Sequence, residues 1–164
     1  MDHSTPQEIV SALRGKKPWG IRVGHGSFLT MEFGKPEADR SPPPPTAHGE
    51  WHLWLYLCNW RIESQEAVLS GSQDERPQMQ RSIETAVFDE VRTIAVSGLS
   101  HDLVIEFKSG TRMLTFSSSS SHEQEQWMLF APDGNCLGVY GDGTWEYTAR
   151  NQPRPRSAPR PSAQ

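Results

Sequence analysis

The residue types that most often bind metals are few in this chain and mostly lie far apart. Among six histidines and two cysteines, only His48, His52 and Cys58 are close in sequence. Along an extended strand, His52 and Cys58 would be about 20 Å apart at about 3.3 Å per residue, which is too far for one zinc ion. No histidine or cysteine forms an HExxH or CxxC pair. We therefore expect no metal site and no cofactor.

The sequence also lacks a recognisable nucleophilic centre. Such a centre needs a serine or cysteine held against a histidine and an orienting acid, and Cys58, on the same strand face as His52, is the only hint of one. Strand residues six positions apart do not touch. We expect both cysteines, Cys58 and Cys136, to be free thiols buried as small apolar groups, and we expect no catalytic residue.

An aromatic segment is the more promising feature. Residues 50–62 alternate between two faces that are both apolar, which is typical of a central strand covered on both sides. The residues that share one of these faces are His52, Trp54, Tyr56 and Trp60. This face could line a ligand pocket. Alternatively, it packs as core under a neighbouring helix, with the indole N–H groups bonded to backbone carbonyls.

Acidic residues gather in segments that we expect to be exposed. The carboxylates concerned are Asp74, Glu75, Glu84, Asp89, Glu90, Glu123 and Glu125. The net charge is −4, but the last 14 residues carry three arginines and no acid, so residues 1–150 hold 13 basic and 20 acidic residues, a net of −7. If the carboxylates converge, they would form a patch that attracts a basic protein partner; otherwise they are a solvated face. Nucleic-acid binding is disfavoured except through the arginine-containing tail.

Composition indicates the class and compartment of the protein. No apolar run reaches the roughly 20 residues needed to cross a bilayer, and two distant cysteines without an apolar leader fit a reducing compartment. We expect a cytoplasmic protein with no membrane association. The expected organisation is one domain over residues 1–150, followed by a disordered Arg/Pro-rich tail over residues 151–164.

Two helices are indicated. A capping box at residues 5–8, with proline at the first helical position, predicts a helix over residues 6–14 that ends at Gly15. Apolar residues at spacings of three and four predict a second helix over residues 78–90, which we expect to cover one face of the sheet.

Most of the remaining chain has the pattern of strands. A hairpin is predicted over residues 19–33, and a loop over residues 34–49 because it contains four consecutive prolines. A second loop is predicted over residues 70–77. Six short strands then follow, joined by hairpin turns, and their predicted ranges are 92–97, 103–108, 112–117, 126–130, 136–140 and 144–148.

The predicted fold is α+β. It consists of a twisted, mostly antiparallel β-sheet of about seven to nine strands, arranged as a meander of hairpins. One or two helices cover this sheet.

The turns and tryptophans of residues 17–148 carry a family resemblance. The stretches concerned are 19–33, 49–54, 127–134 and 142–145, and with them the chain resembles small uncharacterised bacterial domains of the kind encoded beside polymorphic toxins. The resemblance implies an immunity-like or antitoxin-like inhibitor that binds a basic protein such as a toxin without catalysing a reaction. No site residue follows from it, because the shared motifs are structural.

Overall fold

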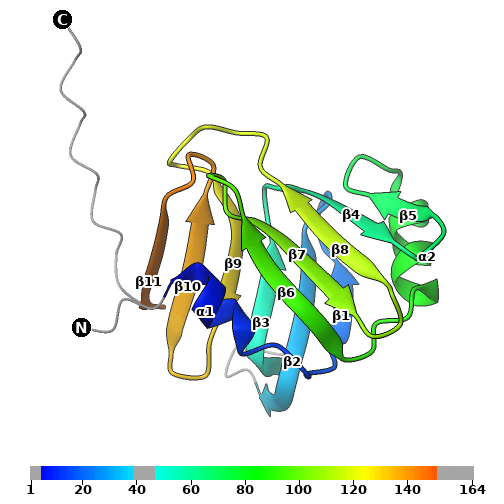
Figure 1. Cartoon of the computed structure of the whole chain (residues 1–164), viewed down its shortest axis with the longest axis horizontal. Coiled ribbons are helices and arrows are strands. Elements are labelled where there is room, and N and C mark those ends of the chain that lie inside the picture. Colours follow the sequence, from blue (N-terminus) through cyan, green and yellow to red (C-terminus); the bar gives the residue numbers. More distant parts are fainter. Residues whose placement is uncertain (1–4, 39–46, 151–164) are drawn as a thin grey trace, which may run out of the picture.

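The computed structural model describes residues 5–38 and 47–150, which form two antiparallel β-sheets and two short helices (Figure 1). The six-stranded sheet has the order β1 (Trp19–Val23), β2 (Leu29–Ala38), β3 (Ala47–Leu55), β9 (Glu125–Phe130), β10 (Asn135–Tyr140) and β11 (Trp145–Ala149). The five-stranded sheet has the order β5 (Val68–Gly71), β4 (Asn59–Glu63), β8 (Arg112–Phe116), β7 (Asp102–Phe107) and β6 (Val91–Ser97). The helices are α1 (Pro6–Ser11) and α2 (Arg76–Thr85).

The core consists of residues that alternate along the strands. In β2, Leu29, Met31 and Phe33 are buried in the same apolar cluster as Leu103 and Ile105 of β7. Because successive side chains point to opposite faces of a strand, the residues between them, including Glu32 in β2, lie on the outer faces of the sheets. Each sheet therefore has an inner face that packs in the shared core and an outer face, and the two outer faces carry different side chains.

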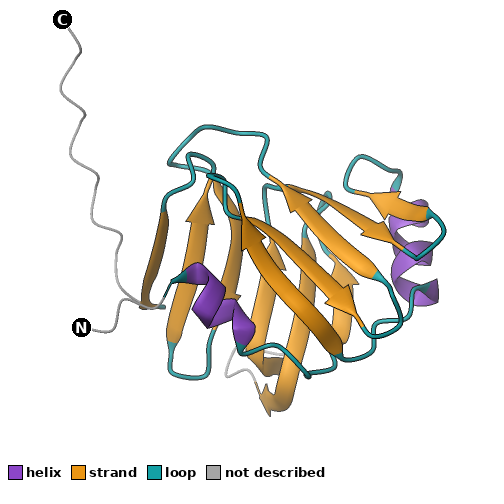
Figure 2. Ribbon diagram, viewed as in Figure 1, coloured by secondary structure: helices purple, strands orange, loops and turns teal. Residues whose placement is uncertain are grey.

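The two helices pack beside the sheets (Figure 2). The predicted capping box of α1 is confirmed, since the Thr5 side chain accepts from the Glu8 amide and the Glu8 side chain accepts from the Thr5 amide. α1 contacts β6, whereas α2 contacts β1 and β5. The expectation that helices cover the sheet is confirmed only in part, because much of each inner face is covered by the other sheet. Neither described helix is long and apolar enough to cross a membrane.

The predicted central strand over residues 50–62 is wrong. β3 ends at Leu55 and β4 begins at Asn59, and the two strands belong to different sheets. The inward-facing positions change at this crossing, from the odd-numbered Leu53 and Leu55 in β3 to the even-numbered Trp60 and Ile62 in β4. In this segment the odd-numbered residues face the core before the crossing and the even-numbered residues face it afterwards. Apolar residues therefore occur at both odd and even positions, as they do in a single strand that is buried on both faces.

Other differences concern element boundaries. The predicted loop over residues 34–49 instead continues β2 to Ala38 and begins β3 at Ala47, with residues 39–46 outside the described residues. The short strand β5 occupies the start of the second predicted loop. The predicted sheet of seven to nine strands is instead two sheets with eleven described strands. The antiparallel pairings β6–β7–β8 and β9–β10–β11 are confirmed. The expected meander is interrupted between β8 and β9, which belong to different sheets. The predicted tail lies outside the described residues.

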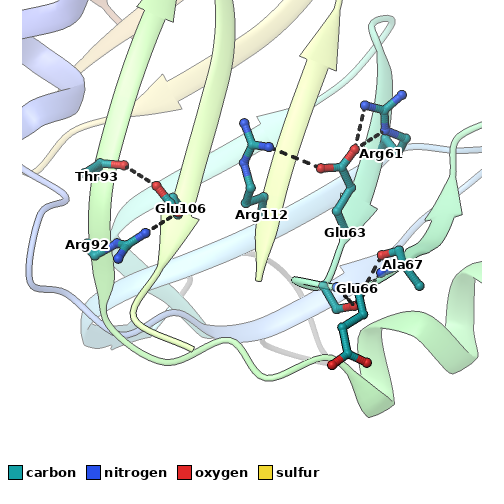
Figure 3. A network of polar contacts seen from close by, with 9 residues as sticks. Arg61, Glu63, Glu66, Ala67, Arg92, Thr93, Glu106 and Arg112 are labelled. Carbon is teal, nitrogen blue, oxygen red and sulfur yellow. Dashed lines mark hydrogen bonds and ion pairs between the residues drawn. The ribbon is translucent and has the colours of Figure 1, made fainter. Parts of the chain in front are cut away.

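Paired charges mark the outer face of the five-stranded sheet (Figure 3). Glu63 forms ion pairs with Arg61 and Arg112. Glu106 pairs with Arg92 and accepts a hydrogen bond from Thr93. On this face the named charged side chains are held in ion pairs, with three arginines around two glutamates.

Candidate functional site

A buried glutamate marks the outer face of the six-stranded sheet. Glu32 of β2 is only 4% exposed. Its Oε2 accepts a hydrogen bond of 2.8 Å from the Gly49 amide, and its Oε1 is in contact with Nδ1 of His52. A buried carboxylate is costly unless it is paired and hydrogen-bonded, so these two contacts are what hold it in place.

Irregular strand pairing makes the space for this glutamate. The register shifts between β1 and β2 near Trp19, and again between β2 and β3 after Phe33. Gly20 has φ +59°, and a Cβ atom there would lie 3.1 Å from Glu32 Cγ. β-Bulges and glycines of this kind redirect side chains and allow close approach. The buried carboxylate is therefore cradled by local backbone distortion on both sides of β2.

His48 and His52 meet beside Glu32. Four residues along a regular strand span about 13 Å, yet the two imidazole centroids are 4.7 Å apart. The shifted register between β2 and β3 lies opposite this part of β3, and a bulge bends its hairpin. His48 Nδ1 lies 3.9 Å from Glu32 Oε1. One coordinating atom from each of the three residues falls within 4.8 Å of the others.

Aromatic rings continue from the histidines across the sheet. Trp54 packs edge-on against His52, Phe130 and Phe28, at centroid distances of 5.4, 4.9 and 5.2 Å. Phe28 in turn contacts Tyr56 at 5.6 Å. The strand register explains the proximity, because His52 pairs with Glu32 on one side and with Phe130 on the other.

These rings surround a cavity of about 140 Å³, which we call the aromatic pocket. Its walls are His48, His52, Trp54, Phe130 and Arg150. The Arg150 guanidinium carbon lies 4.9 Å from the centroid of the Phe130 ring, a cation–π arrangement. Within residues 5–38 and 47–150, Arg150 has no carboxylate as an ion-pair partner. The pocket thus combines aromatic walls with one cationic group.

Two buried nitrogens of the pocket residues have no hydrogen bond within residues 5–38 and 47–150. Among the described residues, neither Trp54 Nε1 nor His52 Nδ1 has a hydrogen-bond partner. For His52 Nδ1, Glu32 Oε1 lies within contact distance but not in the alignment that a hydrogen bond needs. Unsatisfied buried polar atoms are rare in folded proteins and mark candidate ligand or ion sites.

A second hollow of about 130 Å³ adjoins the aromatic pocket and shares Phe130 and Arg150 with it. Cys136 is in its lining, and burial raises the pKa of this thiol to about 12. Burial likewise raises the pKa of Cys58 to about 12. Both cysteines are free, as expected. Because a thiolate is the reactive form, neither residue is suited to nucleophilic chemistry near neutral pH.

The predicted pocket residues separate into two locations. His52 and Trp54 line the aromatic pocket, and Tyr56, which is 42% exposed, joins the same row of rings through Phe28. Trp60 is 2% exposed in the core, where its Nε1 donates to the Ser27 carbonyl at 2.6 Å. Two alternatives were open for this set from the sequence, a pocket or a packed core. His52 and Trp54 line a pocket, whereas Trp60 packs in the core.

The sequence does not identify three contributors to the site, which are Glu32, Phe130 and Arg150. Strand register brings Glu32 and Phe130 to His52, and Arg150 lines the same pocket directly after β11. Of the set His48, His52 and Cys58, which residue spacing argued against as a metal site, the two histidines do lie together, beside Glu32 rather than Cys58. An irregular hairpin cannot be read from residue spacing on an ideal strand.

The predicted acidic set is divided between two parts of the molecule. Asp74, Glu75 and Glu84 belong to α2 or the turn before it. Glu123 lies in the turn before β9 and Glu125 is the first residue of β9, and Figure 1 shows α2 and β9 well apart. Two further members make local contacts.

These two members are Asp89, which accepts from the Ser109 amide, and Glu90, which pairs with Lys108 at 3.7 Å. The structure thus distributes the predicted set along the fold.

Comparison with known proteins finds no match for the chain, whether among family models, curated proteins or solved structures.

Proposed function

We propose that the protein is a small-ligand-binding domain whose aromatic pocket takes a small planar carboxylate. The observation that carries the proposal is a cavity with aromatic walls and a guanidinium that no described carboxylate neutralises. Binding sites of this kind are mostly apolar, with a few polar groups that fix the ligand's orientation.

The polar groups of the pocket favour an acceptor over a donor. Arg150 offers only N–H donors, and Trp54 Nε1 is a buried donor without a partner among the described residues. A guanidinium can bind a carboxylate through two parallel hydrogen bonds, and a small rotation of the indole would let Trp54 Nε1 donate to it as well. The charge and donors of the pocket therefore match an anionic head group.

The pocket walls favour a flat and small body for the same ligand. Phe130, Trp54 and His52 present ring faces and edges to one another, and a planar unsaturated group can extend such offset and edge contacts. The cavity of about 140 Å³ is smaller than the roughly 300–1,000 Å³ of pockets for drug-sized ligands. A single ring with a carboxylate is the size class that fits.

Calorimetry with benzoate and benzamide tests this proposal, in the presence of EDTA so that metal ions play no part. We expect benzoate to bind in the millimolar range or tighter and benzamide to bind at least about tenfold more weakly, because the amide lacks the charge that pairs with Arg150. Arg150→Gln should weaken benzoate binding about tenfold. The matched control is Arg22→Gln, an exposed arginine of β1 in the same sheet.

Two results would count against this function. One is equal affinity for benzoate and benzamide, which would remove the role of charge. The other is equal loss of affinity in the Arg150 and Arg22 variants, which would show a diffuse surface effect rather than a pocket.

The immunity-like inhibitor is a second proposal, supported by the net charge of −7 over residues 1–150. Its binding surface would be the carboxylates around α2, Asp74, Glu75 and Glu84. A partner captured from an extract of the source organism should be lost at high salt and with these three residues replaced by lysine. Capture that persists in the triple variant would eliminate this proposal.

A further inference from the structure

We propose that Glu32, His48 and His52 bind one divalent transition-metal ion such as Zn²⁺. The inference goes beyond carboxylate binding and does not depend on it. It starts from donor atoms of the three side chains, which converge within 4.8 Å of one another.

The geometry of the three donors is close to that of a metal site. Zn²⁺ is bound by histidine nitrogen and carboxylate oxygen at about 2.0–2.2 Å, which puts ligand atoms of a tetrahedral site about 3.3 Å apart. His48 Nδ1 and Glu32 Oε1 are 3.9 Å apart, somewhat farther than this spacing, whereas His52 Nδ1 and Glu32 Oε1 are closer together than this spacing. Small movements of both histidine side chains would therefore bring the three atoms to the spacing of a metal site. The His48 side chain is 38% exposed, which makes it the least buried of the three side chains.

A second observation points to a missing partner at the same place. His52 is 7% exposed, and its Nδ1 has no hydrogen bond within the described part of the chain although Glu32 Oε1 lies against it. His52 Nδ1 and Glu32 Oε1 are in contact but out of hydrogen-bond alignment, and one cation can bind both atoms once they separate to the spacing of metal ligands. A bound ion would therefore resolve an otherwise orphaned buried atom.

The carboxylate is also supported as a metal ligand usually is. The Gly49 amide donates to Glu32 Oε2, which fixes the carboxylate while leaving Oε1 toward the histidines. A hydrogen bond to a side chain that coordinates a metal fixes the orientation of that side chain, and loss of such a bond typically lowers metal affinity by about 10–100-fold. The cradle formed by Gly20 and Gly49 thus holds Glu32 ready for coordination.

The donor set indicates which ions bind. Two imidazoles and one carboxylate suit zinc, nickel, copper or iron, whereas magnesium and calcium prefer oxygen ligands alone. Three protein ligands leave a tetrahedral ion one position for water or for an anionic group. Since His48 and His52 also line the aromatic pocket, a carboxylate in that pocket could occupy this position.

Titration calorimetry of the full chain, without a histidine tag and freed of metal with EDTA that is then removed, tests the site with ZnCl₂ and MgCl₂. We expect one Zn²⁺ per chain at micromolar affinity or better, and no Mg²⁺ binding. His48→Ala should weaken Zn²⁺ binding at least about 100-fold, and this half-exposed side chain can be removed with little risk to folding. Co²⁺ should give visible d–d bands without a thiolate charge-transfer band.

The matched control is His122→Ala. His122 Nδ1 lies 3.5 Å from Asp142, so it forms a histidine–carboxylate pair like that of His52, and within the described residues it is not part of a three-ligand group. We expect its removal to leave Zn²⁺ affinity unchanged. Absence of Zn²⁺ binding, or binding that survives His48→Ala, would overturn the inference.

The metal and carboxylate proposals can fail separately. Zn²⁺ binding is measured without a carboxylate ligand, and benzoate binding is measured in EDTA. A chain that binds benzoate but no Zn²⁺ would overturn only the metal site. A chain that binds Zn²⁺ but no benzoate would overturn only the proposed function.

Discussion

Replacing Glu32 by glutamine removes the charge at the centre of the site while keeping its shape. Both Glu32 and His52 have side chains less than a tenth exposed, so solvent screens their contact little. A hydrogen bond or ion contact to a charged group contributes about 1.5–3 kcal/mol, and the glutamine carbonyl can still accept from the Gly49 amide. We therefore expect Glu32→Gln to lower the free energy of unfolding by about 2 kcal/mol.

Urea denaturation in EDTA measures this loss directly. With a slope of about 2 kcal/mol per molar urea for a chain of this size, a loss of about 2 kcal/mol lowers the midpoint by about 1 M. The matched control is Glu50→Gln on the neighbouring strand, where Oε2 accepts from the exposed Lys35 amide at 3.2 Å. We expect this control to cost less than about 1 kcal/mol.

A double-mutant cycle assigns the effect to the contact itself. Glu32→Gln, His52→Gln and the double variant should give a coupling energy of about 1–2 kcal/mol between the two side chains. Equal midpoints for the Glu32 and Glu50 variants, or a coupling energy near zero, would refute the view that the buried pair stabilises this part of the sheet.

Three further perturbations test other parts of the fold. Burial raises the pKa of Cys58 to about 12, so above about pH 9 the folded state keeps a proton that the unfolded thiol loses. We expect the free energy of unfolding to be independent of this group below about pH 8. Above about pH 9 it should fall by up to about 1.4 kcal/mol per pH unit. Cys58→Ala should reduce that slope in denaturation at pH 7 and 10, and an unchanged slope would contradict it. Gly143→Ala should cost about 3 kcal/mol, because φ is +81° and a Cβ would lie 2.0 Å from the Leu99 carbonyl oxygen, whereas Gly134→Ala, at φ +85° with open space, should cost about 1 kcal/mol. Equal thermal stabilities of the two variants would contradict the clash. Glu63→Gln should lower the free energy of unfolding by less than about 1 kcal/mol at low salt and by less again at high salt, because the arginine partners of Glu63 are over 40% exposed. A larger loss that does not depend on salt would contradict this view.

Local signals predicted the elements of the fold better than their assembly. The capping box of α1 and the hairpins β6–β7–β8 and β9–β10–β11 depend on residues near in sequence, and both are confirmed. The division into two sheets depends on the crossing after Leu55, where the inward-facing parity changes. Hydrophobic alternation read on one ideal strand cannot show such a crossing.

The site was harder to predict because it depends on strand pairing and on irregular backbone. Glu32 lies beside His52 because of the way β2 pairs with β3, and Phe130 lies beside His52 because of the way β3 pairs with β9. The approach of His48 to His52 further needs the shifted register after Phe33. The sequence did indicate an aromatic face with His52 and Trp54, because residues 51–55 of β3 pair with β2 in an unbroken register.

The indole N–H resonances of the tryptophans give the most direct test of the central claim, that the aromatic pocket is a binding site. The Nε1 donor of Trp54 has no partner within the described residues, whereas those of Trp60 and Trp127 are bonded to the Ser27 and His101 carbonyls. In nitrogen-correlated NMR spectra, titration with benzoate should shift the Trp54 resonance and leave the Trp60 and Trp127 resonances in place. A Trp54 resonance that does not move at saturating benzoate, or equal shifts at all three tryptophans, would contradict the account.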